Sequence, residues 1–529
     1  MTLLDLTKQI LNEEEKLREG GGEEGRERQA RLGRLTVRER LDILLDDPQN
    51  FFELGLWAAY GMYSEWGELP AAGVVAGIGT VSGRRCMIIA NDATVKAGAM
   101  FPQSVKKVIR AQNIAFQCRL PTLYLVDSSG VFLPLQDEIF PDEDDFGRIF
   151  RNNALFSSAG IPQFAAIMGN CIAGGGYLPV LCDQLLMTEG SGLYLAGPAL
   201  VKAAIGHDVD AEELGGAKMH AQISGTVDYR EKDDPSCLHR LRSLVEKLPP
   251  DDKASYDAAA ELDPHKVYDF VGAKNEKEYQ VRDLIQCIAD EGSIQEYKAE
   301  YGKTLMTAFA KIGGMPVGIL ANQRVQTKSG RGEVEIGGVL YADSADKGAR
   351  FIMDCNQMHI PLVFLQDVVG FMVGPAAEAS GIIRSGAKLV NALSNSVVPK
   401  ISVVVGNSFG AGNYALCGKA YDPAFIIAWP NAKYAVMGGD QAAHTLFQLE
   451  KRKAERLGEK WDEGQAEERW KVLSKKYCEQ TDIRYGAARG WVDAIAAPHK
   501  TRDILREFLI CVSRNPNRDR RFHTGVIQV

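Results

Sequence analysis

The stretch IPQFAAIMGNCIAGGGYLP, residues 161–179, decides the fold. Its first half is an apolar run and its second half is rich in glycine, which is typical of a buried strand that turns directly into a helix. The same pattern returns as VPKISVVVGNSFGAGNYAL, residues 398–416. When Pro162 is aligned with Pro399, positions 162–177 share five identities with the second stretch, which are Pro162, Gly169, Asn170, Gly175 and Tyr177. An ordered set of this kind indicates an internal repeat, and therefore two copies of one domain.

Helix and strand patterns alternate upstream of each turn. A continuous apolar run, typical of a strand covered on both faces, occupies residues 121–130 in the first half and 360–370 in the second. Helical spacing occurs over residues 104–118, 146–160, 345–359 and 380–396. Strands that alternate with helices predict βαβ units with right-handed crossovers. The fold class is therefore α/β, with two tandem domains.

The N-terminal part has its own signals. Residues 1–30 read as a charged helical extension. In LTVRERLDILLDD, residues 35–47, Thr36 followed by Glu39 predicts a capped amphipathic helix. Ser82 and Gly83 predict a hairpin turn rather than a dinucleotide-binding loop. We place the first domain at 31–295 and the second at 296–529.

Composition excludes several classes of protein. The chain has 529 residues, 45% hydrophobic and 25% charged, as in an ordinary globular protein. Its formal net charge of −8 disfavours nucleic acid as a partner, and we see no apolar run long enough to span a membrane. The acidic start does not resemble a leader peptide, so we expect a cytoplasmic protein, with the mitochondrial matrix less favoured. The ten cysteines include no CxxC pair, which predicts reduced thiols and no metal site.

The paired glycine turns suggest a chemistry. A glycine-rich turn at a helix start offers backbone N–H groups where the helix dipole favours negative charge. Such donors stabilise an oxyanion without any side chain. The alternative is that the glycines only permit tight packing, and for a single turn we would favour that reading. Two related turns instead fit a reaction with two developing anions, one on each reaction partner.

No side-chain base is evident near these turns. The motifs HExxH, GxSxG and GxxxxGK[ST] are absent. We expect Tyr177 and Tyr414 to be buried structural residues. Asp127 and Asp367 end the equivalent strands one step upstream of the turns, where a turn-capping role is expected before a catalytic one. Two electrostatic holes without a protein base suggest that a cofactor supplies the base.

At this point the chain resembles the carboxyltransferase subunit of biotin-dependent acyl-CoA carboxylases, over nearly its whole length. The segments FLPLQDEIFPDEDDFGRIF and GAGNYALCGKAY are typical of the methylcrotonyl-CoA carboxylase-like branch. Other matching segments are LTVRERLDILLDD, LAGPALVKAAIGHDVDAEELGGAKMH, GFMVGPAAEASGIIRSGAKLV and WPNAKYAVMGGDQAA. The resemblance implies two crotonase-like (ClpP-like) domains.

The resemblance also implies two oxyanion holes. The first would use the backbone N–H groups at Gly174 and Gly175 to hold the thioester oxygen of the acyl-CoA. The second would use those at Ala411 and Gly412 to hold the ureido oxygen of biotin. Carboxybiotin would release carbon dioxide, and the biotin ureido nitrogen would remove a proton from the acyl-CoA. The resulting enolate, or dienolate for a 2-enoyl-CoA, would attack carbon dioxide.

Further site residues are expected by the same resemblance. The acyl group would contact Gly130, Phe132, Tyr177 and Phe371. Lys96 and Arg110, with Lys106 and Lys107, could reach the CoA phosphates, although solvated surface side chains are an equal alternative. The biotin side would include Gly410, Asn413, Tyr414 and Asp367. No metal is expected on this chain.

The expected partners are an acyl-CoA and a separate biotin-bearing subunit. The chain lacks a biotinylation MKM motif and an ATP-grasp region, so the biotin carboxylase and carrier functions would lie on another chain. Six copies of this chain are expected per assembly, as a trimer of dimers. The site would lie between the first domain of one copy and the second domain of another.

Alternative functions remain at this level. Asp367, within LQDVVG, is reminiscent of a glutaconyl-CoA decarboxylase, which runs the transfer in reverse. Two other segments, DSSG and AGGGY, differ from the DSGG and AGGAY that are usual in the family, but both keep the backbone N–H donors. A single crotonase-like hydratase or isomerase is disfavoured because its chain is about half as long and carries catalytic glutamates. A non-catalytic scaffold would not need two intact glycine turns.

Overall fold

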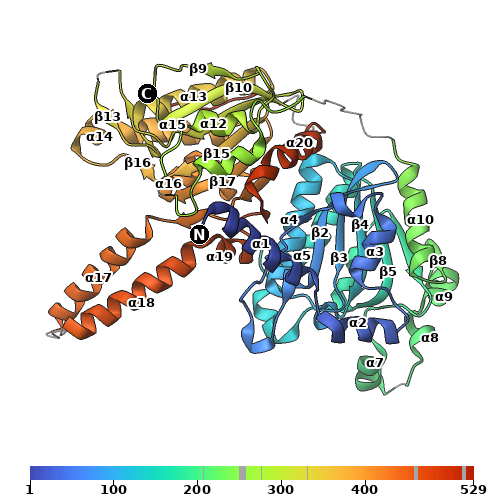
Figure 1. Ribbon diagram of the computed structural model, residues 1–529. Coiled ribbons are helices and arrows are strands. Elements are labelled where there is room, and N and C mark those ends of the chain that lie inside the picture. The colour runs from blue at the N-terminus through green and yellow to red at the C-terminus, as the bar shows by residue number, and fades with distance from the viewer. Residues whose placement is uncertain are drawn as a thin grey trace. The chain divides into compact units, whose positions relative to one another are not determined.

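The computed structural model describes residues 1–206, 208–249, 258–275, 277–330, 332–457, 463–514 and 520–528. The chain divides into two compact units. The N-terminal unit comprises Asn12–Lys253 with Ala487–Gly490, and the C-terminal unit comprises Met1–Leu11, Ala254–Gly486 and Trp491–Val529. Each unit contains one eight-stranded sheet, which confirms the predicted pair of α/β domains (Figure 1).

The sheet of the N-terminal unit begins with antiparallel strands and continues with parallel ones. Its order is β1-β2-β3-β4-β5-β6-β8, and β7 also pairs with β5. The strands from β3 onward are parallel, as expected for strands joined by helices. The bounds are β1 Phe52–Leu54, β2 Val74–Val81, β3 Arg84–Asn91, β4 Thr122–Ser128, β5 Gln163–Ile172, β6 Gln184–Thr188, β7 Gly192–Tyr194 and β8 Tyr229–Glu231.

Helices cover the two faces of this sheet (Figure 1). One face packs on α3 and α10 through a core that includes Leu41, Ile88, Leu125 and Leu241, all at most 4% exposed. Helices α4 and α5 pack together on strands β2, β3 and β5. The helices of this part of the chain are α1 Leu3–Arg18, whose residues up to Leu11 belong to the C-terminal unit, α2 Gly22–Arg31, α3 Val37–Leu44, α4 Pro102–Cys118, α5 Phe146–Ser158, α6 Tyr177–Val180, α7 Pro198–Ile205, α8 Ala211–Gly215, α9 Ala217–Met219 and α10 Asp234–Glu246.

The C-terminal unit repeats this plan. Its sheet order is β20-β18-β17-β15-β11-β10-β9, with β19 beside β17, and the strands from β11 to β20 are parallel. Two small ladders, β12-β13 and β14-β16, lie outside this sheet. The strands are β9 Gln295–Tyr297, β10 Leu305–Ile312, β11 Met315–Asn322, β12 Thr327–Lys328, β13 Val334–Glu335, β14 Val339–Leu340, β15 Leu362–Val368, β16 Gly370–Phe371, β17 Lys400–Phe409, β18 Phe425–Ala428, β19 Lys433–Ala435 and β20 Ala494–Ile495.

Helices α13 and α15 pack side by side on one face of this second sheet, through a core that includes Phe351, Phe364 and Leu389. Helix α20 stacks Phe508 on Phe425 of β18, with ring centroids 3.8 Å apart. Helices α17 and α18 form a long antiparallel pair that no sequence pattern had predicted (Figure 1). The helices are α11 Val267–Phe270, α12 Val281–Gln286, α13 Ala342–Gln357, α14 Pro375–Ala379, α15 Ile382–Ser394, α16 Gly410–Ala415, α17 Gly439–Arg456, α18 Glu463–Thr481, α19 Ile483–Ala488, whose residues from Ala487 belong to the N-terminal unit, and α20 Thr501–Val512.

Local predictions from the sequence are largely confirmed. Thr36 and Glu39 form a reciprocal capping box at the start of α3. Ser82 and Gly83, both at positive φ, join β2 to β3 as the predicted hairpin turn. The division between the units falls at Lys253, earlier than the predicted boundary at 295, because residues from Asn275 onward make buried contacts within the C-terminal unit. None of the described helices is long and apolar enough to cross a membrane.

Candidate active site

The two glycine turns have the same backbone construction. In the N-terminal unit β5 ends, Ala173 adopts a left-handed conformation with φ of 58°, and a short helical turn leads into α6. In the C-terminal unit Gly410, which aligns with Ala173 in the repeat, adopts φ of 54° at the start of α16. An alanine is rarely found in this conformation, so its presence at 173 shows that the turn geometry is maintained against local preference.

The predicted donors lie directly after these left-handed residues. Gly174 and Gly175 follow Ala173, and Ala411 and Gly412 occupy the equivalent positions in α16. The first N–H groups of a helix find no acceptor within the helix, and the dipole there favours an anion. Gly174 and Gly175 are half-buried, whereas Ala411 is exposed and Gly412 is buried. The two turns can therefore each present backbone donors to an anionic oxygen.

A second backbone segment accompanies each turn. Met100 donates its N–H to Gly130 at 2.8 Å and accepts from the N–H of Phe132 at 2.9 Å, so Val131 directs its own N–H to the other side. Gly130 approaches the turn closely, since a Cβ placed on it would lie 3.2 Å from the carbonyl oxygen of Ile172. Val131 is thus a further candidate backbone donor beside the first turn.

The C-terminal unit repeats this segment. Leu340 pairs with Phe371 and accepts the N–H of Met372 at 2.8 Å, as Met100 does with Phe132. Gly370 has a positive φ, as Gly130 does. Sequence analysis named Gly130 and Phe371 for the acyl pocket but did not identify backbone donors here. One signal in the sequence could have revealed these backbone donors. A glycine follows each strand aspartate at the same distance, Gly130 after Asp127 and Gly370 after Asp367.

An apolar groove of about 370 Å³ opens beside the second turn, within the C-terminal unit. Ala411 and Phe371 line it, together with Val373 and Ile383, whose side chains are 76% and 74% exposed. Phe371, which was expected in the acyl pocket of the first turn, thus lies beside the second turn. The groove thus combines exposed apolar surface with the backbone donors of α16. Such a mixture suits a ligand with a flat apolar body and a polar edge.

The predicted role of the two tyrosines needs correction. Tyr177 is 53% exposed and Tyr414 is 51% exposed, so neither is the buried structural residue expected from the sequence. Both stand in the first helical turn after the glycines, where a side chain points outward. The Tyr177 ring centroid lies 6.0 Å from that of Phe150. Both phenols are available to a ligand at their own turn.

Aromatic side chains surround the first turn. A Cβ placed on Gly174 would lie 3.8 Å from Phe146, whose ring packs edge-on against Phe150. Phe132, predicted for the acyl pocket, stacks on Phe101 with centroids 4.2 Å apart. Phe146 and Phe150 therefore supply apolar surface beside the first turn, whereas Phe132 packs against the cluster that contains Phe101.

The predicted phosphate-binding cations do not form one group. Lys96 is exposed and lines a polar cavity of about 720 Å³ with Lys16, Arg28 and Arg31. Lys106 is exposed on α4, and Arg110 on the same helix is half-buried and already has an interaction. The structure therefore gives Lys96 basic neighbours different from those that its sequence position suggested.

The predicted role of Lys107 in binding a CoA phosphate is wrong, because this side chain is 7% exposed and cannot reach a phosphate in solution. Its ammonium group donates to the carbonyl oxygens of Ala71 and Val74. Burial lowers the pKa of Lys107 to about 7. Lys347, at the equivalent position of the second repeat, is 1% exposed and donates to the carbonyl of Tyr301 at 2.9 Å. The lysine is thus a structural feature of both repeats.

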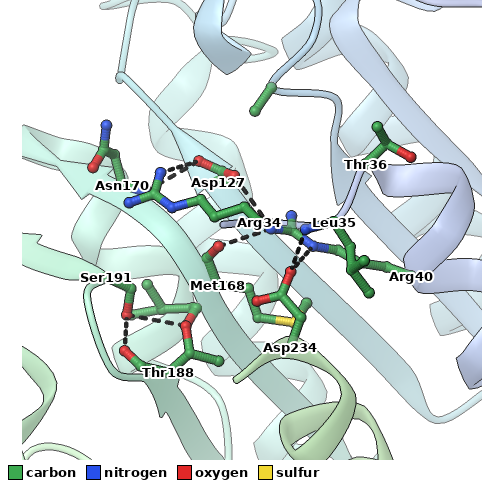
Figure 2. Close-up of polar contacts among 12 residues, drawn as sticks. Arg34, Leu35, Thr36, Arg40, Asp127, Met168, Asn170, Thr188, Ser191 and Asp234 are labelled. Carbon is green, nitrogen blue, oxygen red and sulfur yellow. Dashed lines mark hydrogen bonds and ion pairs between the residues drawn. The ribbon is translucent and has the colours of Figure 1, made fainter. Parts of the chain in front are cut away.

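Asp127 and Asp367 lie beneath the two turns rather than in them, at 3% and 2% exposed. Asp127 pairs with Arg40 at 3.4 Å and with Arg34 at 3.7 Å (Figure 2). Asp367 pairs with Arg324 at 3.1 Å and accepts the Tyr279 hydroxyl at 3.1 Å. Burial raises the pKa of each carboxyl, and the arginines oppose that shift. The predicted contact between Asp367 and biotin is therefore replaced by contacts within the protein.

Asn413 is also held by the protein. Its amide donates to Ser408 at 2.8 Å, and Ser408 donates to Gln366 at 2.7 Å. This chain of hydrogen bonds ties the start of α16 to strands β17 and β15. Asn413 thus supports the second turn, and a contact of its side chain with biotin stays a prediction.

The remaining groups to place are the possible metal ligands and the cysteines. The part of the chain that the structure describes contains no group of three or more His, Cys, Asp or Glu side chains placed to hold a metal ion. All ten cysteines are free thiols, and burial raises the pKa of Cys171, beside the first turn, to about 12.

Comparison with known proteins gives consistent matches over the whole chain. The carboxyl transferase domain family matches residues 28–524. The biotin-dependent 3-methylcrotonyl-coenzyme A carboxylase beta1 subunit of Mycobacterium tuberculosis is 45% identical over 491 residues, 92% of this chain and 90% of that protein. The mitochondrial methylcrotonoyl-CoA carboxylase beta chain of Arabidopsis thaliana is 43% identical over 514 residues, 95% of this chain and 85% of that protein. The crystal structure of the Pseudomonas aeruginosa geranyl-CoA carboxylase beta subunit matches with a TM-score of 0.84 and 33% identity, covering 100% of this chain and 96% of that one.

Proposed function

This chain belongs to the carboxyl transferase family, and on that premise we propose that it is the carboxyltransferase subunit of a biotin-dependent acyl-CoA carboxylase. The observation that carries the proposal is the repeated turn, in which a left-handed residue precedes backbone donors at 174–175 and again at 411–412. Two such turns match a transfer in which negative charge develops on both partners. The best candidate substrate is 3-methylcrotonyl-CoA or a similar 2-enoyl-CoA, as in the relatives named above.

The first turn would hold the thioester oxygen. The N–H groups around Gly174 and Gly175, with that of Val131 as a candidate third, would stabilise the oxygen as it becomes an enolate or dienolate. Phe132, Phe146 and Tyr177 would lie along the acyl chain. One such donor is worth about 2.7–4 kcal/mol of transition-state stabilisation, so two or three can replace a side-chain acid.

The second turn would hold the ureido oxygen of biotin, carried on another subunit. The N–H groups of Ala411 and Gly412 would stabilise the negative charge that stays on the ureido group when the carboxyl group leaves as carbon dioxide. Phe371 and Ile383 of the apolar groove would contact the ring system. Biotin supplies the carboxyl group and the base. This assignment explains why the chain needs no histidine or glutamate base of its own.

The CoA portion would be held by charge. Lys96 has Lys16, Arg28 and Arg31 around the same polar cavity, and three acidic residues, Glu19, Glu24 and Glu68, also line it. The surplus of one positive charge suits phosphates without binding them strongly. We propose Lys96 as the first of these side chains to test, and we do not assign Lys107 to this role because it is buried.

The proposed partner is a separate subunit that carries biotin and its carboxylase. The assembly would contain six copies of this chain, with each site formed between two copies. A cytoplasmic location is part of the proposal. Transfer in the reverse direction, as in a decarboxylase, had been suggested by Asp367, but that side chain is 2% exposed and bonded within the protein, so it does not favour the alternative.

The test is a carboxyl-transfer assay with the purified chain and free biotin, in both directions. The panel contains 3-methylcrotonyl-, geranyl-, glutaconyl- and propionyl-CoA with their carboxylated products. We expect biotin-dependent loss of carboxylate from 3-methylglutaconyl-CoA to be the fastest reaction. A preference for glutaconyl-CoA would favour the decarboxylase, and no transfer with any substrate in the presence of the biotin-bearing subunit would contradict the proposed function.

A further inference from the structure

Beneath the first turn, a buried cluster of Arg40, Asp127 and Asp234 forms hydrogen bonds with the backbone on either side of Gly169. Arg40, 1% exposed, donates from Nη2 to the carbonyl of Met168 at 2.8 Å and from Nε to Asp234 at 2.8 Å (Figure 2). Asp127 accepts the N–H of Asn170 at 3.1 Å. The carbonyl before Gly169 and the N–H after it are thus bonded to the Arg40 guanidinium and the Asp127 carboxyl group, just upstream of Gly174.

In the C-terminal unit, different side chains form hydrogen bonds with the equivalent peptide groups. Asn407 donates its N–H to Asp367 at 2.8 Å, as Asn170 does to Asp127. The carbonyl of Val405, equivalent to that of Met168, accepts from the side-chain amide of Asn431 at 3.1 Å. An asparagine therefore performs in one repeat what an arginine performs in the other. The two arrangements differ in charge, and their side chains come from different parts of the repeat, but they form hydrogen bonds with the same two backbone groups.

The carboxylates also set the local backbone path. A Cβ on Gly169 would overlap the Asp127 carboxylate, and one on Gly406 would overlap that of Asp367. The parallel pairing of the flanking strands shifts register at these aspartates, between Val126 and Ser128 and between Gln366 and Val368. Each aspartate, near the end of β4 or β15, thus fills the space beside a glycine of the neighbouring strand β5 or β17. At this point the pairing of the two strands changes register, shortly before β5 or β17 leads into its turn.

From this repeated arrangement we propose that Asp127 with Arg40, and Asp367 with Asn431 and Arg324, are positioning residues for the two oxyanion holes. They touch no substrate. They hold the ends of β5 and β17 so that the donors at 174–175 and at 411–412 stand at the right place for an oxygen. A displacement of about 1 Å at a reacting centre can cost about 100-fold in rate, so small errors at the strand end matter. The inference rests on the proposed function and adds a separate support to each half of the site.

The test uses the assembled enzyme with its biotin-bearing subunit and, in parallel, the transfer to free biotin. Asp127→Asn and Asp367→Asn keep the side-chain shape but remove the negative charge. We expect each to lower kcat at least tenfold. Asp127→Asn should raise KM for the acyl-CoA and leave KM for free biotin within twofold, and Asp367→Asn should do the opposite. A merely structural role would not divide the two KM values in this way.

A matched control lies elsewhere in the C-terminal unit. Asp290 is 4% exposed, pairs with Arg502 at 2.6 Å and accepts the N–H groups of Gly313 and Gly314 at 2.8 and 2.7 Å. Asp290→Asn should lower the melting temperature with kcat and both KM values within twofold of the wild type. If an Asp127 or Asp367 variant fails to fold, Arg40→Lys and Asn431→Ala replace it with the same expected division of KM values.

Two results overturn the inference. One is that the variants lose activity only in proportion to their loss of thermal stability, as Asp290→Asn would. The other is that Asp127→Asn and Asp367→Asn change both KM values alike. A wild-type enzyme without transfer activity would instead contradict the proposed function, and the inference with it, so the two failures are distinguished by the wild-type measurement.

Discussion

Gly412 gives the sharpest test of the second turn, because its Cα hydrogen faces the core while its N–H belongs to the start of α16. A Cβ at this position would lie 2.5 Å from Cγ2 and 3.1 Å from Cγ1 of Val368. Carbon atoms in ordinary contact are about 3.5–4.0 Å apart, so about 1 Å of movement is required. Val368 is fully buried in β15, and the helix start is therefore the part that moves.

The magnitude follows from this overlap. Overpacking of a well-packed core costs about 1–3 kcal/mol, so Gly412→Ala should lower the free energy of unfolding by that amount. Displacement of the donors by about 1 Å should lower the rate of carboxyl transfer about 100-fold. Transfer to free biotin measures the rate, and urea unfolding measures the stability.

Val368→Ala supplies the rescue. It removes both γ-carbons and leaves the Val368 Cβ at 3.4 Å from the added methyl group, which is a tolerable contact. The double variant Gly412→Ala/Val368→Ala should therefore recover most of the transfer rate, although Val368→Ala alone costs about 2 kcal/mol in buried methyl groups. A Gly412→Ala enzyme within threefold of the wild-type rate, or a double variant no faster than the single one, would refute the placement of the donors.

Three other substitutions give separate tests. A Cβ at Gly175 meets no atom within 4 Å, so Gly175→Val should change the free energy of unfolding by less than about 1 kcal/mol. Its side chain would enter the proposed acyl-CoA space, so carboxyl transfer should fall below detection. An active variant would argue that residue 175 lies outside the site. Burial lowers the pKa of Lys107 to about 7 in the folded chain, against 10.5 in the unfolded chain. Between pH 7 and 10.5 the unfolded state therefore binds one proton that the folded state does not, and the free energy of unfolding should rise with pH, by about 2 kcal/mol from pH 7 to 9. Urea midpoints at the two pH values measure this rise, and Lys107→Met should abolish it; an unchanged slope would show that Lys107 does not titrate there. Thr36→Ala should cost about 0.5–2 kcal/mol through loss of the α3 capping box, with Thr36→Ser close to wild type and with unchanged kinetic constants in both; equal unfolding midpoints for the two variants would contradict the cap.

Local sequence patterns determined the elements and their repetition. Apolar runs that end in glycine, helical spacing, and the pair Thr36 and Glu39 depend on neighbouring residues, so they could be recognised without tertiary contacts. The alignment of the two halves located both turns and both aspartates, whereas the candidate donors at 174–175 and 411–412 came from the resemblance to the carboxyltransferase family. The α17–α18 pair was missed, although α17 has the apolar periodicity of an amphipathic helix and only α18 is weakly periodic.

Burial and pairing were decided only by the tertiary structure. Lys107 and Lys96 are equally basic in the sequence, yet one lies inside the core and the other lines a polar cavity. Tyr177 and Tyr414 could have been buried, and the structure exposes about half of each. Asn431 reaches the carbonyl of Val405, and Arg40 reaches that of Met168, although each pair is far apart in the sequence. A sequence determines which groups a chain carries, whereas their solvation and partners depend on which distant segments fold against them, and these contacts decide which charges support the turns and which remain free to meet a substrate.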